Sequence, residues 1–134
     1  MTVELRNSPN LSKPRGFSHV SIAPAGRIVH IAGQVGTDSN GVLQGGLAEQ
    51  TERALLNLAE ALDAAGATAA DLVKLTYLVV GWREAMIPEF VAGITKAAAT
   101  RPFPPVPSTL HGVQSLFLDG MLVEVEGVAV LPPE

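Results

Sequence analysis

The sequence predicts a two-layer α+β domain in which two helices cover one face of a mainly antiparallel sheet. The chain has 134 residues, the length of one domain, and residues 1–15 are expected to form an N-terminal arm of it. Hydrophobic residues make up 47% and charged residues 16%, which is too apolar for a disordered chain. Two helical patterns alternate with β-prone runs in the order β-β-α-β-α-β-β, which indicates two packed layers.

The first predicted elements are the arm and a β-hairpin. Residues 1–15 contain several Asn, Ser and Pro residues and no apolar run, a composition typical of an irregular segment. Residues 18–23 and 27–33 are β-prone runs separated by residues 24–26 (PAG). Pro at the first turn position and Gly at the third are typical of a three-residue loop closed by a left-handed Gly. The two runs are therefore expected to pair with each other.

The middle of the chain is predicted to form a loop, a helix and a buried strand. Residues 34–46 contain four glycines with Asp, Ser and Asn, which indicates a loop. In residues 47–65 apolar side chains recur every three or four positions, so one face of a helix is expected to be buried. Gly66 is expected to end this helix, because glycine is common just after the last helical residue. Residues 68–71 have the capping-box spacing of a short helical turn. Residues 72–80 are apolar apart from one Lys and one Thr, as in a central strand.

The C-terminal part is predicted to contain one more helix and two strands. Residues 83–100 form the second helical pattern, which Pro88 weakens near its start. Residues 101–107 contain four prolines and cannot form a helix or a central strand. Residues 108–113 and 121–131 are β-prone and complete the sheet.

Composition excludes several classes of function. The formal net charge is −4 and the nine Lys and Arg residues are scattered, which argues against a nucleic-acid partner. No apolar run approaches the length of a membrane-spanning helix, and the N-terminus does not resemble a secretory signal. We therefore expect a cytoplasmic protein without a membrane partner. Few charged side chains remain to coat the surface, so some apolar surface is expected in a subunit interface.

No motif for a metal ion or a cofactor is present, and none is expected. The glycine clusters lack the order of a nucleotide-binding loop, and there is no cysteine. A metal site would need His19, His30 and His111 to converge. The predicted three-residue hairpin places His19 and His30 on opposite faces, whereas a two-residue loop would place them side by side. The roles of the three histidines stay open.

Two carboxylates in the last predicted strand are the most informative charged residues. Glu124 and Glu126 lie two positions apart, so both point to one face, while Val123 and Val125 point to the other. One interpretation is a solvent-facing row on an exposed sheet. The other is a carboxylate in a cleft between subunits, which binds a cationic group or orients a water molecule.

Seven short segments stand in a characteristic order: residues 16–19 (GFSH), 31–35 (IAGQV), 49–58 (EQTERALLNL), 64–66 (AAG), 72–76 (LVKLT), 107–109 (PST) and 122–126 (LVEVE). Together they resemble the YjgF/RidA family, the reactive intermediate deaminases, over nearly the whole domain. The resemblance implies a chorismate-mutase-like fold of the bacillus type and a homotrimer with a central barrel. It also implies small-molecule clefts between subunits, in which members with a complete site hydrolyse enamines and imines without metal or cofactor.

The resemblance also shows where this chain departs from the deaminating members. Pro107 stands where they have the Arg that binds the substrate carboxylate, and Phe17 stands where they have Tyr. Ala32 replaces a Ser, and Pro88 aligns less securely with an Asn. Every missing group is polar, so the pocket is expected to favour neutral or cationic ligands.

The resemblance leaves Glu124 at the position of the family's water-orienting Glu, so it is the expected catalytic residue. The expected substrate-binding residues are Phe17, Ala32, Gly33, Pro107 and Thr109. The first hypothesis is a metal-independent hydrolase that acts on an imine, enamine or related small substrate other than a 2-imino acid. The alternative is a non-catalytic trimeric metabolite-binding or regulatory protein. Low charge and few aromatic residues disfavour a ribonuclease or a translation inhibitor.

Overall fold

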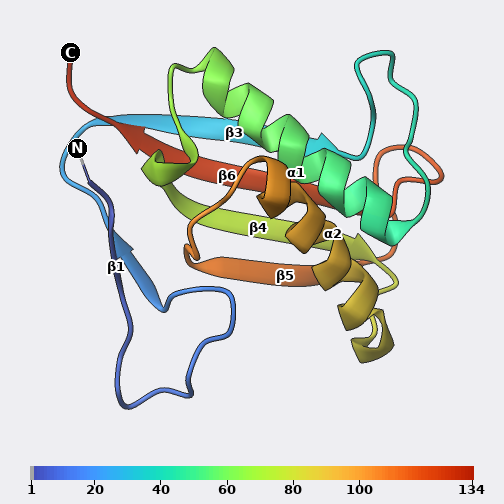
Figure 1. The fold of residues 1–134 in the computed structure, drawn as a ribbon, viewed down its shortest axis with the longest axis horizontal. Coiled ribbons are helices and arrows are strands. Elements are labelled where there is room, and N and C mark those ends of the chain that lie inside the picture. Colours follow the sequence, from blue (N-terminus) through green and yellow to red (C-terminus); the bar gives the residue numbers. More distant parts are fainter. Residues whose placement is uncertain (1) are drawn as a thin grey trace.

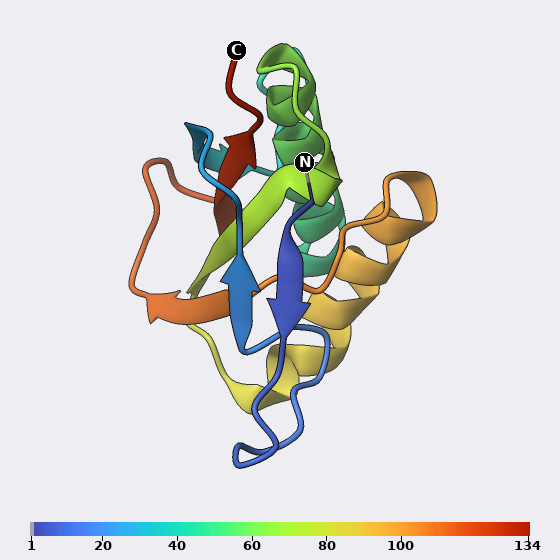
Figure 2. The same ribbon diagram turned by 90° about the vertical axis from the view of Figure 1, so that its left-hand side faces the viewer.

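The computed structural model describes residues 2–134. Two α-helices pack on a four-stranded sheet, which gives two layers (Figure 1). The helices are α1 (Leu47–Ala64) and α2 (Ile87–Thr100). Both lie on the same side of the sheet (Figure 2). The sheet consists of β3 (Arg27–Val35), β4 (Leu72–Val80), β5 (Ser108–Val113) and β6 (Val123–Leu131).

The strands of this sheet lie in the order β3-β6-β4-β5, so β3 and β5 are its two edges. The pairs β3/β6 and β4/β6 are antiparallel, whereas β4/β5 is parallel. A parallel pair needs a crossover connection. The segment that contains α2 provides it, because α2 follows β4 in the chain, packs on the sheet and precedes β5. The predicted fold class is confirmed, and the sheet is mainly antiparallel because two of its three pairs are.

The core lies between the helices and one face of the sheet. Leu55, Leu58 and Leu62 of α1 are almost completely buried. Buried and less buried residues alternate along β6, so Val123 and Val125 point into the core, as predicted. Glu124 and Glu126 therefore lie on the opposite face, which no helix covers.

The predicted hairpin is wrong. β2 (Val20–Ile22) pairs with β1 (Glu4–Arg6) in a separate two-stranded sheet, and β3 pairs with β6 instead. The edge of β3 away from β6 has no strand partner within residues 2–134, because β2 is held elsewhere by its pairing with β1 and by a hydrogen bond from Ser21 to β4. Gly26 does not have a positive φ. A Cβ at Gly26 would overlap the backbone oxygen of Leu131, so the glycine is needed for this close approach rather than for a tight turn.

The N-terminal segment is more ordered than predicted. It forms β1, and the loop after β1 is closed by the His19 ring: its Nδ1 accepts a hydrogen bond from the Ser8 N–H at 3.0 Å, and its Nε2 lies 3.1 Å from the Ser12 carbonyl oxygen. Ser21 of β2 donates a hydrogen bond to the carbonyl oxygen of Val73 at 2.6 Å. No local sequence pattern predicts these contacts, because they join residues that are 7 to 52 positions apart.

Most other predicted boundaries are close to the observed ones. β4 and β5 begin and end where predicted, and α1 ends one residue early. Residues 68–71 form the predicted turn as a 3-10 helix (Ala69–Asp71), with the Asp71 carboxylate accepting a hydrogen bond from the Thr68 N–H. The second helical pattern is divided into a 3-10 turn (Glu84–Met86) and α2, in whose first turn Pro88 lies. Within residues 2–134, neither helix combines the length and the apolarity needed to cross a bilayer.

Candidate functional site

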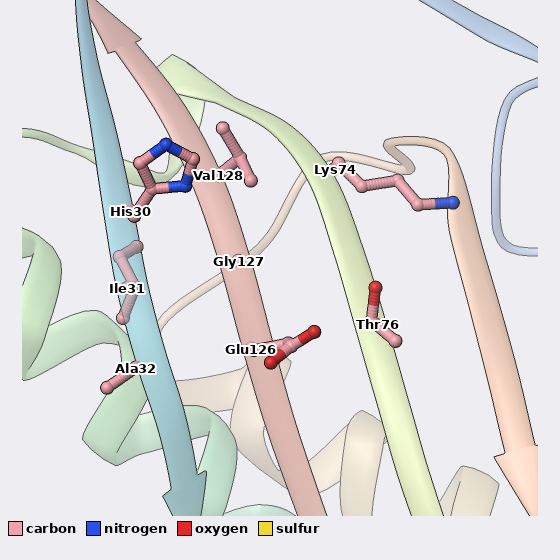
Figure 3. Close-up of a pocket in the computed structure, with 8 residues that line it drawn as sticks. All are labelled: His30, Ile31, Ala32, Lys74, Thr76, Glu126, Gly127 and Val128. Carbon is pink, nitrogen blue, oxygen red and sulfur yellow. The ribbon is translucent and has the colours of Figure 1, made fainter.

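The face of the sheet without helices has a hollow of about 430 Å³, which polar and apolar residues line in equal parts. Figure 3 shows it with the helices behind the sheet: His30 comes from β3, Glu126 from β6, and Lys74 and Thr76 from β4. The Lys74 side chain extends towards β5, where its Nζ donates a hydrogen bond to Thr109 Oγ1 at 2.7 Å. Glu126 is exposed and lies opposite Thr76 in the strand register.

Glu124 lies two residues before Glu126, on the same face of β6, and is only partly exposed. Its neighbour in space is Gly33, because a Cβ added to Gly33 would overlap the Glu124 carboxylate. Ala32 and Gly33 occupy a β-bulge, where the β3/β6 register shifts between Ile31 and Gln34. The bulge and the missing side chain of Gly33 together leave room for the carboxylate beside the β3 backbone.

A second hollow, an apolar groove of about 530 Å³, lies at the other edge of the sheet. We call it the β5 groove, and its lining residues come from β4, β5, α2 and residues 15–17. They include Phe17 and Thr109 of the expected site and Tyr77 of β4. Burial raises the pKa of Tyr77 to about 12, so its hydroxyl stays a neutral hydrogen-bond donor at neutral pH.

The expected site residues therefore fall into two groups. Ala32, Gly33 and Glu124 lie at the β3 and β6 strands, and Phe17, Pro107 and Thr109 lie at β5 or beside it. Pro107 precedes β5, and its carbonyl oxygen accepts a hydrogen bond from the Leu75 N–H at 3.0 Å. Adjacent strands are about 4.8 Å apart, so β5 lies roughly 14 Å from β3 and roughly 10 Å from β6, the strand of Glu124. One chain by itself does not bring the two groups together.

The sequence analysis missed three residues of these hollows. Arg15 lies in the segment predicted to be an irregular arm, yet it lines the β5 groove. Tyr77 is the only tyrosine and Lys74 the only charged residue of β4. Lys74 was a detectable signal, because a charge in an otherwise apolar strand needs a specific partner. Nothing local indicated that Arg15 would reach the groove.

The three histidines are far from forming a common site. The backbone partners of the His19 ring lie in the N-terminal segment, whereas His30 lies on the edge strand β3 and His111 on the opposite edge strand β5. The prediction that His19 and His30 point to opposite faces of one hairpin falls with the hairpin. Within the described part of the chain, no three His, Asp or Glu side chains are arranged to hold a metal ion.

The fold and these hollows define the class: a two-layer α+β protein whose candidate binding residues lie towards the two opposite edges of a sheet that helices cover on one face only. Residues 10–131 match the family model described as endoribonuclease L-PSP. The chain therefore belongs to this family, the YjgF/RidA family, as its sequence segments suggested.

Solved structures show the same relationship. A Rid-family protein of Yersinia pestis is 37% identical, with a TM-score of 0.86 over 98% of this chain and 100% of that one. A YjgF-family member from Mycobacterium tuberculosis is 25% identical, with a TM-score of 0.61 over 97% of this chain and all of that one. The expected chorismate-mutase-like fold is thereby confirmed.

Curated relatives match over a shorter stretch. The 2-iminobutanoate/2-iminopropanoate deaminases of Homo sapiens and Bos taurus are each 42% identical over 55 residues, which is 40% of this chain. The match spans about two-fifths of the length of these relatives, 40% in each case.

Proposed function

We propose that this protein is a homotrimer whose small-molecule cleft lies between protomers, and that it hydrolyses an imine, an enamine or a related small substrate other than a 2-imino acid. The observation that carries the proposal is the division of the expected site residues between the two edges of the sheet. The β5 edge of one protomer, with Phe17, Pro107 and Thr109, would face the β3 edge of the next, with Ala32, Gly33 and Glu124.

The two edges support an assembly of this kind. β3 and β5 each have one strand neighbour within residues 2–134, so each leaves backbone groups available for a further contact. A contact between two different edges is heterologous, and it forms a closed ring of three where successive protomers are rotated by a third of a turn. Exposed apolar side chains, such as Ile28 of β3 at 66%, would be covered by the ring.

Glu124 is the proposed general base. Its carboxylate accepts a proton from a water molecule whose oxygen adds to the carbon of the C=N bond. The proton then passes to the nitrogen, and collapse of the adduct releases ammonia or an amine and leaves a carbonyl group. An enamine enters the same route after it takes up a proton at carbon. This reaction needs only water and Glu124, without a metal ion or a cofactor. The proposed location of the protein is the cytoplasm.

The alternative function is a non-catalytic trimer that binds a metabolite or has a regulatory role. It is favoured by one specific feature: Pro107 and Phe17 lack the polar groups that the deaminating members have at these positions. A cleft in which Glu124 is the main polar group would bind a ligand without positioning a second reactant. Glu124→Gln distinguishes the two functions, as described in the Discussion.

The first expected outcome concerns assembly. Three chains of 13.9 kDa should give a particle of roughly 40 kDa at micromolar concentration. Light scattering coupled to size-exclusion chromatography, and native mass spectrometry, measure this mass directly. A monomer or a dimer at that concentration would rule out the proposed cleft.

The second expected outcome concerns 2-imino acids. The protein should not accelerate the release of ammonia from 2-aminoacrylate generated by a dehydratase. The reason is that Pro107 stands where the deaminating members have the Arg that binds the substrate carboxylate. A bidentate, charge-assisted pair contributes several kcal/mol to binding. The human 2-iminobutanoate/2-iminopropanoate deaminase is the positive control. An acceleration equal to that of the human protein would contradict this specificity.

A further inference from the structure

The loop between β1 and β2, residues 7–19, is closed by its last residue, and we call it the N-terminal loop. Three hydrogen bonds within the described chain join the first half of this loop to the residues that follow it, and all three involve His19. The ring accepts one from the Ser8 N–H through Nδ1 at 3.0 Å, and its Nε2 lies 3.1 Å from the Ser12 carbonyl oxygen. The His19 backbone N–H donates the third to Asn7 Oδ1 at 2.9 Å. A single residue therefore holds the loop closed.

These contacts require one protonation state of the His19 ring. A backbone N–H can only donate, so Nδ1 accepts the hydrogen bond from Ser8 with its lone pair and carries no proton. A carbonyl oxygen can only accept, so Nε2 carries the proton that it donates to Ser12. The neutral imidazole with its proton on Nε2 satisfies both contacts. An imidazolium has an N–H at both positions, so its Nδ1–H would face the Ser8 N–H and the contact would be lost.

The charged groups of the neighbouring elements provide no partner for an imidazolium at this position. None of the ion pairs found within residues 2–134 involves His19. β2 has no charged residue, and the elements around it carry Glu4 and Arg6 of β1, which pair with each other, Lys13 and Arg15 of the N-terminal loop, Lys74 of β4, and Glu89 and Lys96 of α2. Cations outnumber carboxylates in this set. A proton on Nδ1 would therefore lose the contact with Ser8 without gaining an ion pair.

The second half of the N-terminal loop reaches the candidate site. Residues 15–17 line the β5 groove, and within the described chain no hydrogen bond is found from residues 13–17 to any other residue. The Phe17 ring packs edge-on against the His19 ring at a centroid distance of 6.3 Å. Ser18 is buried and β2 begins two residues later, so the chain is anchored just after Phe17. The position of Phe17 in the groove therefore depends on the closed loop.

We propose that His19 is a pH-sensitive latch: the neutral ring holds the N-terminal loop closed, and protonation of Nδ1 opens the loop and withdraws Phe17 from the β5 groove. Because the closed loop needs the neutral ring, its stability is present at high pH and is lost as the pH falls. Histidine side chains change charge between about pH 5 and pH 8, so the loop responds within this range. Every contact of the latch lies within one protomer, so the latch does not depend on the proposed function.

NMR of the ¹⁵N-labelled protein tests the latch directly. At pH 7.5 the imidazole shifts of His19 should show a proton on Nε2 and none on Nδ1. Protection of the Ser8 amide against hydrogen exchange, corrected for the intrinsic rate at each pH, should be about tenfold lower at pH 5, the effect of losing one hydrogen bond. Amides of α1 should keep their protection. A proton on Nδ1 at pH 7.5, equal protection of Ser8 at both pH values, or a parallel loss in α1 would overturn the proposal.

Two substitutions by asparagine assign the pH dependence to one ring. Asn carries an oxygen on Cγ where His carries Nδ1, so His19→Asn keeps an acceptor for the Ser8 N–H that does not titrate. In this variant the protection of the Ser8 amide should be the same at pH 5 and pH 7.5. His111→Asn is the matched control, because it removes an exposed imidazole on β5, and it should preserve the pH dependence of the wild type. The same pH dependence in His19→Asn as in the wild type would contradict the latch.

Trypsin at pH 7.5 measures how firmly the latch holds the segment that lines the groove. Lys13 precedes a proline, so the bond after Arg15 is the one that trypsin can cut in the N-terminal loop. His19→Leu removes both ring contacts and should speed this cleavage about tenfold, because proteolysis follows the population of the open form. His19→Asn should stay within about threefold of the wild type. Equal rates in the wild type and His19→Leu would show that His19 does not hold this segment.

The mass of the particle separates the latch from the proposed function. A monomer whose N-terminal loop still opens at pH 5 would contradict the proposed trimer and support the latch. A trimer in which the protection of the Ser8 amide does not depend on pH would support the trimer and contradict the latch.

Discussion

Glu124→Gln is expected to lower the rate of imine or enamine hydrolysis by at least about a hundredfold, because a general base contributes on the order of 10²–10⁴ to such reactions. Glutamine keeps the shape of the side chain but cannot take the proton from water. The oligomer should stay intact. The measurement is the turnover of the best substrate from a panel of imines and enamines, with mass determined in parallel.

Glu126→Gln is the matched control, since Glu126 lies on the same face of the same strand but is exposed and lies opposite Thr76 rather than Gly33. This variant should retain the rate. Gly33→Ala is an independent test, because its Cβ would displace the Glu124 carboxylate while the flexible side chain can move at little cost in stability. Full activity of the Glu124→Gln variant would contradict the role of Glu124 as a general base. If no substrate is turned over and Glu124→Gln weakens the binding of a cationic ligand, the protein is the non-catalytic trimer.

Leu58→Ala should lower the free energy of unfolding by about 3 kcal/mol, within the range of about 2–5 kcal/mol for a buried Leu. Leu58 is fully buried in α1, and its Cδ1 would lie 3.5 Å from a Cβ added at Gly127 of β6. Gly127 has no side chain that could fill the space left by the missing methyl groups. The cavity would therefore persist between the helix and the sheet.

Urea unfolding at a fixed protomer concentration measures this loss, because oligomer stability depends on concentration. Leu118→Ala is the control with the same chemical change, and it should alter the free energy little since Leu118 is 57% exposed. Similar losses in the two variants would mean that Leu58 is not part of the core described here.

The sequence predicted best the elements whose pattern is local. The spacing of apolar residues in α1 and the apolar run of β4 were sufficient to predict their type and nearly their bounds. The alternation along β6 predicted correctly that Glu124 and Glu126 share a face. Each of these patterns depends on helical or strand periodicity, which the sequence contains directly.

The partner of a strand was not predictable in this way. The segment containing β2 lies next to β3 in the sequence and had a plausible turn between them, but β2 pairs with β1 and β3 with β6. Pairing depends on which strands offer matching length and faces after the whole chain has collapsed. The turn signal at residues 24–26 is local, and it did not outweigh the contacts that β2 makes with β1 and β4.

By itself, the sequence determined the fold class, the family and the face of Glu124, because short motifs and periodic patterns specify them. Only the tertiary structure decided that the expected site residues lie at opposite edges of the sheet, and that Arg15 and Tyr77 meet in one groove. Arg15 and Tyr77 are 62 positions apart in the chain. Their proximity follows from the packing of α2 and of residues 15–17 against the sheet edge, which no pattern within either segment specifies.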